Sequence, residues 1–190
     1  MSEINKNNLA DKTILVTGAG SGVGKAAAIA YASHGANVIL LGKTSSKLEK
    51  VYDEIENLDC PTPSISLMNL LVANTKDYQE LIDNLLIEYN QLDGLLLNAA
   101  ILGDRTPIEQ YDVDKWVETI HINLTSQFIL VKTLLPALKE SEDASVVFTT
   151  SGVGKIGKAF WGAYSVSKFG IEGLSQILSE EIDNDNSIRF

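Results

Sequence analysis

Cysteine is almost absent from the sequence. Cys60 stands alone, so no disulfide can form within the chain, and a reducing compartment fits this composition. Long apolar runs are absent too: none approaches the ~20 residues of a membrane-spanning helix, and the polar residues 1–12 include no apolar signal core. These absences predict a soluble, cytoplasmic protein.

Basic residues are scarce as well. Fifteen Lys and Arg face 25 Asp and Glu, which gives a formal net charge of −10. This balance argues against nucleic acid or an anionic membrane as the main partner, so an anionic cofactor must be bound by backbone amides or a few placed cations. With one cysteine there is no metal-ligand cluster, and no G-x-S-x-G nucleophile motif occurs. We therefore expect no nucleic-acid or membrane partner and no metal.

Apolar runs alternate with amphipathic stretches along the chain. Strands are predicted at 13–17, 37–41, 64–68, 92–98 and 144–150, with a helix after each of them. No internal repeat or low-complexity linker interrupts the series, and 190 residues with 45% hydrophobic content can bury one substantial core. The pattern predicts a single α/β domain over residues 1–190: a doubly wound parallel sheet of the Rossmann type, in three α/β/α layers.

Several helix boundaries can be predicted from single residues. Gly35 is expected just after the first helix, and Ser45 or Ser46 at the N-cap of the second. Asp112 is expected to cap a long helix that reaches Leu138, with Pro136 bending or ending it. The last helix is expected at about 161–182. Residues 188–190 look like the opening of a sixth strand. Because the sequence stops there, we expect the fifth strand to be left as an exposed edge.

A glycine-rich turn joins the first strand to the first helix. The common G-x-G-x-x-G pattern is not satisfied, because Val23 occupies the place of its third glycine, but T-G-x-x-x-G-x-G fits from Thr17 onward. Such a turn lets the backbone approach a pyrophosphate at a helix N-terminus. The residues expected to bind the cofactor here are Gly18, Ser21, Gly22, Val23 and Gly24. The alternative is a glycine-rich turn without a ligand.

The end of the second strand bears on the choice of nucleotide. A carboxylate there would bind the ribose 2′-hydroxyl of NAD, whereas a cation would accommodate the 2′-phosphate of NADP. The residues are Gly42 and Lys43, and no acid follows until Glu49. This favours NADP(H) over NAD(H), unless Lys43 is an ordinary solvated lysine.

The stretch SGVGKIGKAFWGAYSVSK, from Ser151 to Lys168, holds a candidate proton-transfer pair. Tyr164 and Lys168 are four residues apart, so they share one face of a helix. A phenol ordinarily ionises near pH 10, and a nearby ammonium group favours the phenolate. Taken alone, the spacing is a weak signal that chance can produce, and Ser151 could be a simple loop hydroxyl.

An ordered set of motifs resembles one family. TGAGSGVG, LLLNAA at 95–100, INLTSQF around Asn123, Ser151 and YSVSK match the short-chain dehydrogenase/reductase family in order and spacing, from about Lys12 to the end of the chain. Within that family the same stretches resemble the YciK-like bacterial oxidoreductases. The resemblance implies hydride transfer between a nicotinamide cofactor and a carbonyl or alcohol substrate.

The resemblance also implies roles for single residues. Tyr164 would exchange a proton with the substrate oxygen. Lys168 would favour the phenolate form of Tyr164 and bind the nicotinamide ribose, and Ser151 would polarise the substrate carbonyl. Asn123 would hold a water in the proton relay, although it could instead bond a backbone carbonyl where the long helix bends. Cofactor contacts are further implied for the following residues: Asn69, Leu70, Asn98, Ala99, Tyr164 and Lys168.

Two positions depart from the family pattern. Ala100 replaces the usual glycine of Asn-Ala-Gly, and Asn69 replaces the usual acid that binds the adenine, although its amide can still pair with a base edge. Trp161 and Phe160 could belong to the core or to the wall of a substrate pocket. His34 and His121 are expected at the surface or in packing.

The expected function is thus that of an NADP(H)-preferring oxidoreductase. One alternative is a non-catalytic dinucleotide sensor or scaffold; another, a transferase, would leave Tyr164 and Lys168 unexplained. The resemblance implies a homodimer or homotetramer through the long helix after Asp112 and the helix of Tyr164. It also implies two further strands, a proline-glycine turn and a substrate loop beyond these 190 residues, so the substrate pocket is expected to be incomplete.

Overall fold

The computed structural model describes residues 8–182 and 188–190, and it contains one parallel sheet of six strands in the order β3-β2-β1-β4-β5-β6. The strands are β1 (Thr13–Thr17), β2 (Asn37–Gly42), β3 (Ser64–Leu67), β4 (Gly94–Leu97), β5 (Ala144–Phe148) and β6 (Ile188–Arg189). The helices are α1 (Gly22–Ser33), α2 (Ser45–Glu56), α3 (Thr75–Tyr89), α4 (Val113–Ile120), α5 (Ser126–Lys139) and α6 (Gly162–Ile182). All five strands expected from the sequence are confirmed, with boundaries that shift by up to two residues.

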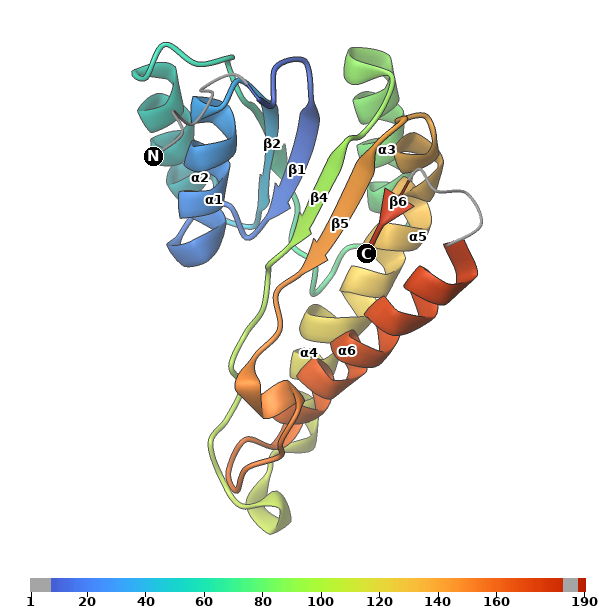
Figure 1. The fold of residues 1–190 in the computed structure, drawn as a ribbon. Helices are drawn as coiled ribbons and strands as arrows, with labels where there is room; N and C mark the ends of the chain where they lie inside the picture. Colours follow the sequence, from blue (N-terminus) through green and yellow to red (C-terminus); the bar gives the residue numbers. More distant parts are fainter. Residues whose placement is uncertain (1–7, 183–187) are drawn as a thin grey trace, which may run out of the picture.

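Helices cover both faces of this sheet (Figure 1). Because neighbouring residues of a strand point to opposite faces, Leu15 packs into the cluster formed with α3 and α5, whereas Val16 packs into the cluster formed with α1 and α2. The strands between the two clusters are apolar on both faces, and every residue of β1 and of β4 is buried. The predicted doubly wound, three-layer fold is confirmed.

Helix ends follow the sequence closely, with one correction. Gly35 follows α1 with φ +93°, a left-handed conformation that glycine adopts without strain, as predicted. The N-cap of α2 is Thr44 and not Ser45 or Ser46, because the helix already begins at Ser45. The hydroxyl of Ser45 instead donates a hydrogen bond to the carboxylate of Glu49, at 2.6 Å.

The long helix after Asp112 is not uniform. Asp112 caps α4 by accepting a hydrogen bond from the Lys115 amide, as predicted. A π-helical turn (His121–Thr125) then separates α4 from α5. Pro136 lies inside α5, which continues to Lys139, so the expectation that it might end the helix is wrong. In the last turn of a helix, proline removes only one backbone hydrogen bond.

The end of the chain forms the sixth strand that residues 188–190 suggested. Ile188 pairs with Ala144 and Arg189 pairs with Ser145, both parallel. The first two residues of β5 are therefore covered, contrary to the expectation of a free edge, whereas Val147 farther along β5 remains half exposed. Across residues 8–182 and 188–190, no helix has both the length and the apolar character needed to cross a membrane.

Because all strands are parallel, their carboxyl ends meet at one edge of the sheet. In Figure 1 the segments that follow β4 and β5 run side by side beyond this edge, next to α4 and the start of α6. This arrangement brings the glycine turn after β1, the segment after β4 and the segment after β5 to the same end of the molecule. The candidate site residues lie there.

Candidate active site

The glycine turn after β1 is closely packed. Gly18 has φ +66°, and a Cβ atom on Gly24 would lie 2.4 Å from the carbonyl oxygen of Gly18 and 2.7 Å from the side-chain nitrogen of Asn98. Only glycine fits at position 24 unless the turn opens. Val23 points outward and is 65% exposed. The turn thus brings its backbone, free of side chains, to the start of α1.

A cavity of about 200 Å³ lies beside this turn, between the ends of β1, β2 and β4 and the segment after β3. Six of the predicted cofactor-binding residues line it: Gly18, Ser21, Lys43, Asn69, Leu70 and Ala99. Six others are not part of its lining: Gly22, Val23, Gly24, Asn98, Tyr164 and Lys168. The glycine turn leaves no room for side chains at its closest contacts, and the cavity next to it carries a lysine. Together they fit a dinucleotide whose phosphates lie at the start of α1.

Thr17, at the end of β1, is bonded to β4 and to the segment that follows it. Its hydroxyl accepts hydrogen bonds from the amides of Asn98 and Ala99, both at 2.9 Å, and donates to the carbonyl of Leu96 at 3.2 Å. The hydroxyl of Thr149 in turn donates to the Asn98 side-chain oxygen at 3.3 Å. The roles of Thr17 and Thr149 were missed in the sequence, although a hydroxyl residue at the end of an otherwise apolar strand is a visible signal.

Tyr164 and Lys168 lie one turn apart near the start of α6, as predicted. The Lys168 side chain is buried, with 3% of the residue exposed, and its ammonium donates to the carbonyl oxygen of Thr149 at 2.6 Å. The ammonium nitrogen is 5.7 Å from the centre of the Tyr164 ring. Burial disfavours the charged form and lowers the pKa of Lys168 to about 8.

Ser151 begins the segment that leads from β5 to this helix. Its side-chain oxygen accepts a hydrogen bond from the Val153 amide at 3.4 Å, which caps a 3₁₀ turn over Gly152–Gly154. A Cβ on Gly154 would lie 2.9 Å from the Lys168 side chain, so this turn packs directly against α6. Ser151 is half-buried.

Asn123 lies in the π-helical turn and is fully buried. Its side-chain oxygen accepts from the Ile101 amide and its nitrogen donates to the Ile101 carbonyl, both at 2.8 Å, and the nitrogen also donates to Ser167 at 3.1 Å. The side chain therefore fastens the segment after β4 to α6, beside Lys168. Asn123 thus does bond a backbone carbonyl, as the alternative had it, although that carbonyl belongs to Ile101 and not to the helix itself. The water-holding role stays a prediction.

Two further residues of the long helix hold segments that line the cavity. A ring nitrogen of His121 lies 3.1 Å from the Leu70 carbonyl oxygen, and the Gln127 side chain donates to the Ala99 carbonyl at 3.2 Å. His121 packs as expected. Gln127 was missed, although a buried glutamine in an apolar helix is the kind of signal that could have found it.

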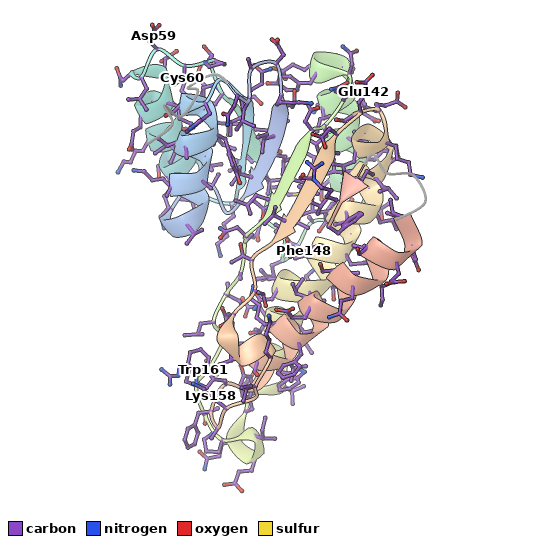
Figure 2. The ribbon with its side chains drawn as sticks, in the orientation of Figure 1. Asp59, Cys60, Glu142, Phe148, Lys158 and Trp161 are labelled. Carbon is purple, nitrogen blue, oxygen red and sulfur yellow. The ribbon has the colours of Figure 1, made fainter. Side chains whose placement is uncertain are left out.

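Aromatic residues lie beside Tyr164. The ring centre of Trp161 is 5.8 Å from that of Tyr164, and the guanidinium carbon of Arg105 is 4.5 Å from the Trp161 ring centre. Trp161 is half-buried and Phe160 is exposed, so neither belongs to the core, which leaves the pocket-wall alternative. Figure 2 shows Trp161 and Lys158 at the end of the molecule beyond the strand ends.

The arrangement determines what the site can do. A phenol and a buried ammonium lie one helical turn apart, and the turn that begins at Ser151 packs against the same helix. All three groups lie at the edge of the sheet that also carries the glycine turn. They can exchange a proton with a substrate oxygen and stabilise charge on it. No group of three or more His, Cys, Asp or Glu that could hold a metal occurs within residues 8–182 and 188–190.

Comparison with known proteins gives consistent results. The family model for short chain dehydrogenases matches residues 12–190. The chain is 41% identical to the uncharacterized oxidoreductase YciK of Escherichia coli K12 over 91% of its own length and 69% of that protein. A short chain dehydrogenase from Salmonella enterica superimposes with a TM-score of 0.95 at 38% identity, covering 98% of this chain and 76% of that one. A structure from Escherichia coli CFT073 complexed with NADPH gives 0.94 at 40% identity, covering 98% and 77%.

Proposed function

Because the chain belongs to the short chain dehydrogenase family, we propose that it uses NADP(H) to interconvert a carbonyl compound and an alcohol. Its predicted resemblance to the YciK-like oxidoreductases is confirmed by the sequence identity. One observation carries the proposal: the buried Lys168 ammonium lies one helical turn from Tyr164, at the edge of the sheet that holds the glycine turn. Burying an amine is costly, and a structural role alone gives no reason for it.

In the proposed reduction, the Tyr164 hydroxyl gives its proton to the carbonyl oxygen of the substrate. The nearby Lys168 ammonium favours the phenolate that remains, and the Ser151 hydroxyl hydrogen-bonds to the same substrate oxygen. The cofactor, when bound, supplies the hydride. Oxidation of an alcohol uses the same groups in the reverse direction.

Asn123 acts on this set through its contacts. By tying Ile101 and Ser167 together, it keeps α6 in register with the segment after β4. We further propose the water-holding role for it, which would lead protons from Lys168 toward solvent.

The charges near the cavity support the proposed preference for NADP(H). Lys43 and Lys47 both belong to its lining, and in the described part of the chain no carboxylate does. Two cations without a competing acid suit a 2′-phosphate. The related structure with NADPH supports the same choice. The side-chain oxygen of Asn69 accepts a hydrogen bond from the Leu71 amide at 3.2 Å, which leaves its NH₂ group to pair with an adenine edge.

We also propose that the protein assembles as a homodimer or homotetramer. Exposed apolar side chains lie on α4, α5 and α6: Val113, Val117, Phe128, Val166 and Phe169. Such an accumulation is typical of an interface. Sedimentation of the protein and of Phe169→Glu tests this, and a monomeric wild type would contradict it. A cytoplasmic location, expected from the single free Cys60, is part of the same proposal.

One experiment tests the enzymatic proposal directly. NADPH and NADH are titrated against the protein, and cofactor oxidation is then followed with a panel of aldehydes and ketones for the wild type and Tyr164→Phe. We expect tighter binding of NADPH, and a fall in kcat/KM of about 10²- to 10⁴-fold in the variant with its NADPH affinity unchanged.

The alternatives give different results. Equal or tighter binding of NADH would contradict the role of Lys43. Tight cofactor binding without turnover of any carbonyl would instead favour the non-catalytic sensor.

A further inference from the structure

The segment between β4 and α4 carries an arginine close to the proposed reaction centre. The guanidinium carbon of Arg105 is 4.5 Å from the centre of the Trp161 ring, and that ring is 5.8 Å from the centre of the Tyr164 ring. Together these distances put the guanidinium carbon no more than 10.3 Å from the centre of the Tyr164 ring (4.5 Å plus 5.8 Å). Arg105 and Trp161 are 56 positions apart in the sequence, so only the fold brings them together.

Close packing fixes the course of this segment. Gly103 has φ +66°, and a Cβ there would lie 2.5 Å from the Thr119 hydroxyl. The Tyr111 hydroxyl accepts a hydrogen bond from the Asp104 amide at 3.1 Å. A Cβ on Gly162, at the start of α6, would lie 2.6 Å from the Tyr111 ring. The backbone next to Arg105 is thus held against both α4 and α6.

Stacking leaves the hydrogen-bond donors of Arg105 available. A guanidinium that lies over an indole uses its flat face, and its five N–H groups project from the edge. Within residues 8–182 and 188–190, Arg105 forms no ion pair with a carboxylate. The neighbouring Asp104 acts on Lys115 instead: the pKa of Lys115 is raised first by its hydrogen bond to Glu118, and also by the charge of Asp104.

An exposed arginine on a chain with 25 acidic residues could pair with a carboxylate. This one is oriented by an aromatic ring next to the proposed proton donor. A planar fork of donors in a preorganised position is suited to bidentate binding of a carboxylate or phosphate.

We propose that Arg105, positioned by Trp161, is a specificity-determining residue that binds an anionic group of the substrate. The preferred substrates are then carbonyl or alcohol compounds that carry a carboxylate or phosphate several bonds from the reacting carbon. The choice of reacting carbon rests on the proposed function of Tyr164, whereas the binding of an anion by Arg105 does not.

The first test compares matched substrates. With NADPH, kcat/KM is measured for 4-oxocyclohexanecarboxylate and its neutral methyl ester at low ionic strength. We expect the wild type to prefer the acid by about ten- to a hundred-fold, the range of a charge-assisted hydrogen bond, mainly through KM. Arg105→Gln should bring the ratio close to one. Lys158→Gln removes an exposed lysine near Trp161 that does not stack on it, and should leave the ratio unchanged.

Other variants separate charge from geometry. Arg105→Lys keeps the charge but loses the planar fork, so we expect it to retain only part of the preference. The pair dihydroxyacetone phosphate and dihydroxyacetone distinguishes a phosphate from a carboxylate as the preferred anion. The proposal would be overturned if the wild type shows no preference for the charged member of either pair, the acid over its ester or the phosphate over the neutral ketone. An Arg105→Gln variant that keeps the preference would overturn it too.

A second test does not depend on turnover. The chain has two tryptophans, so Trp116→Phe leaves Trp161 as the only indole while keeping an aromatic ring beside Tyr111. Fluorescence of this variant is titrated with cyclohexanecarboxylate and with the neutral cyclohexanecarboxamide. We expect the acid to bind at least ten-fold tighter, and Arg105→Gln to abolish the difference.

The two tests fail in distinguishable ways. If no carbonyl compound is turned over but the acid still binds through Arg105, the proposed reaction is wrong and the anion site stands. Equal binding of the acid and the amide shows that Arg105 does not select an anion, whatever the turnover.

Discussion

Buried polar side chains lie at both edges of the sheet, and the two groups differ in how fully they are bonded. At the edge where the strands begin, the Asp93 carboxylate accepts four hydrogen bonds, three from side chains and one from the backbone. Their donors are the Thr13 amide (2.8 Å), the Lys12 ammonium (2.9 Å), the Gln91 amide (2.9 Å) and the Ser141 hydroxyl (2.7 Å). Burial alone would raise the pKa of Asp93, but these partners outweigh it and lower the pKa.

At the opposite edge, Lys168 is equally buried but has one acceptor among the described residues, the Thr149 carbonyl. An ammonium carries three protons, so two remain for other groups. Burial here lowers the pKa of the amine to about 8 and is not offset by partners. A buried charged group whose hydrogen-bonding capacity is fully used holds the strands together. A buried charged group with unused donors can bind a ligand.

The largest expected effect is on activity, from Lys168→Met. The variant keeps the volume of the side chain but loses the ammonium, so we expect kcat to fall by about a thousand-fold. The free energy of unfolding at pH 7 should not decrease, because a costly buried charge is removed. Steady-state kinetics and urea denaturation measure the two quantities. A clear loss of stability with little loss of activity would mean that Lys168 is the structural group, contrary to the roles we give to Asp93 and Lys168.

Asp93→Asn should do the opposite. The amide cannot accept from four donors at once, and the Lys12 ammonium loses its partner, so we expect a loss of about 3 kcal/mol in the free energy of unfolding. Asp93 is far from the site, so kcat at a temperature where the variant stays folded should change less than two-fold.

The pH dependence of this loss provides a check. The native-state pKa of Asp93 is lowered, so the stability that Asp93 contributes is present above its unfolded-state pKa near 4 and disappears as the pH falls through the native-state value. The difference between wild type and Asp93→Asn should therefore shrink in acid. A constant difference from pH 7 to pH 3 would contradict this account.

A smaller effect is expected from the titration of Lys168. Its pKa is about 8 in the native state and near 10.4 in the unfolded chain. Between these two pKa values the unfolded state binds more protons than the native state, so the free energy of unfolding rises with pH over that range. Below pH 8 this gain in stability is absent. Relative to Lys168→Met, the wild type should gain about 2 kcal/mol between pH 7 and pH 10 in urea denaturation. Parallel curves for the two proteins would exclude a buried, titrating amine.

The smallest effect is expected for the contact at the surface of the site. The Thr150 hydroxyl donates to the Glu172 carboxylate at 2.7 Å, and this hydrogen bond is exposed. Thr150→Ala should lower the free energy of unfolding by less than about 1 kcal/mol, measured by thermal denaturation. A loss as large as that of Asp93→Asn would mean that exposure does not separate the two groups.

The fold was predictable because local and long-range signals agree. Most strands are apolar runs, α3 has a clear helical apolar period, and Gly35 and Asp112 lie where helix ends require them. The parallel order follows from this alternation alone. The pairing of Tyr164 with Lys168 was predictable for the same reason, because it lies within one helix.

Features that depend on contacts between distant segments were not predictable. The π-helical turn coincides with two side chains that bond the Ile122 carbonyl, Ser126 at 2.7 Å and Gln127 at 2.9 Å, and no periodicity signals such competition. Three hydroxyl residues in a row, Thr44 to Ser46, are all suited to the N-cap of α2, so the sequence alone does not select one. In the structure the N-cap is Thr44. Nothing in the order of residues places Arg105 over Trp161.

The position of β1 in the sheet has a consequence for synthesis of the chain. β1 pairs with β2 on one side, only about 25 residues later in sequence, and with β4 on the other, about 80 residues later. While the chain emerges from the ribosome, β1 to β3 can pair first, and one side of β1 then waits as an open template until Gly94–Leu97 arrives. That interval is when we expect the nascent chain to be most exposed to mispairing and most in need of a chaperone.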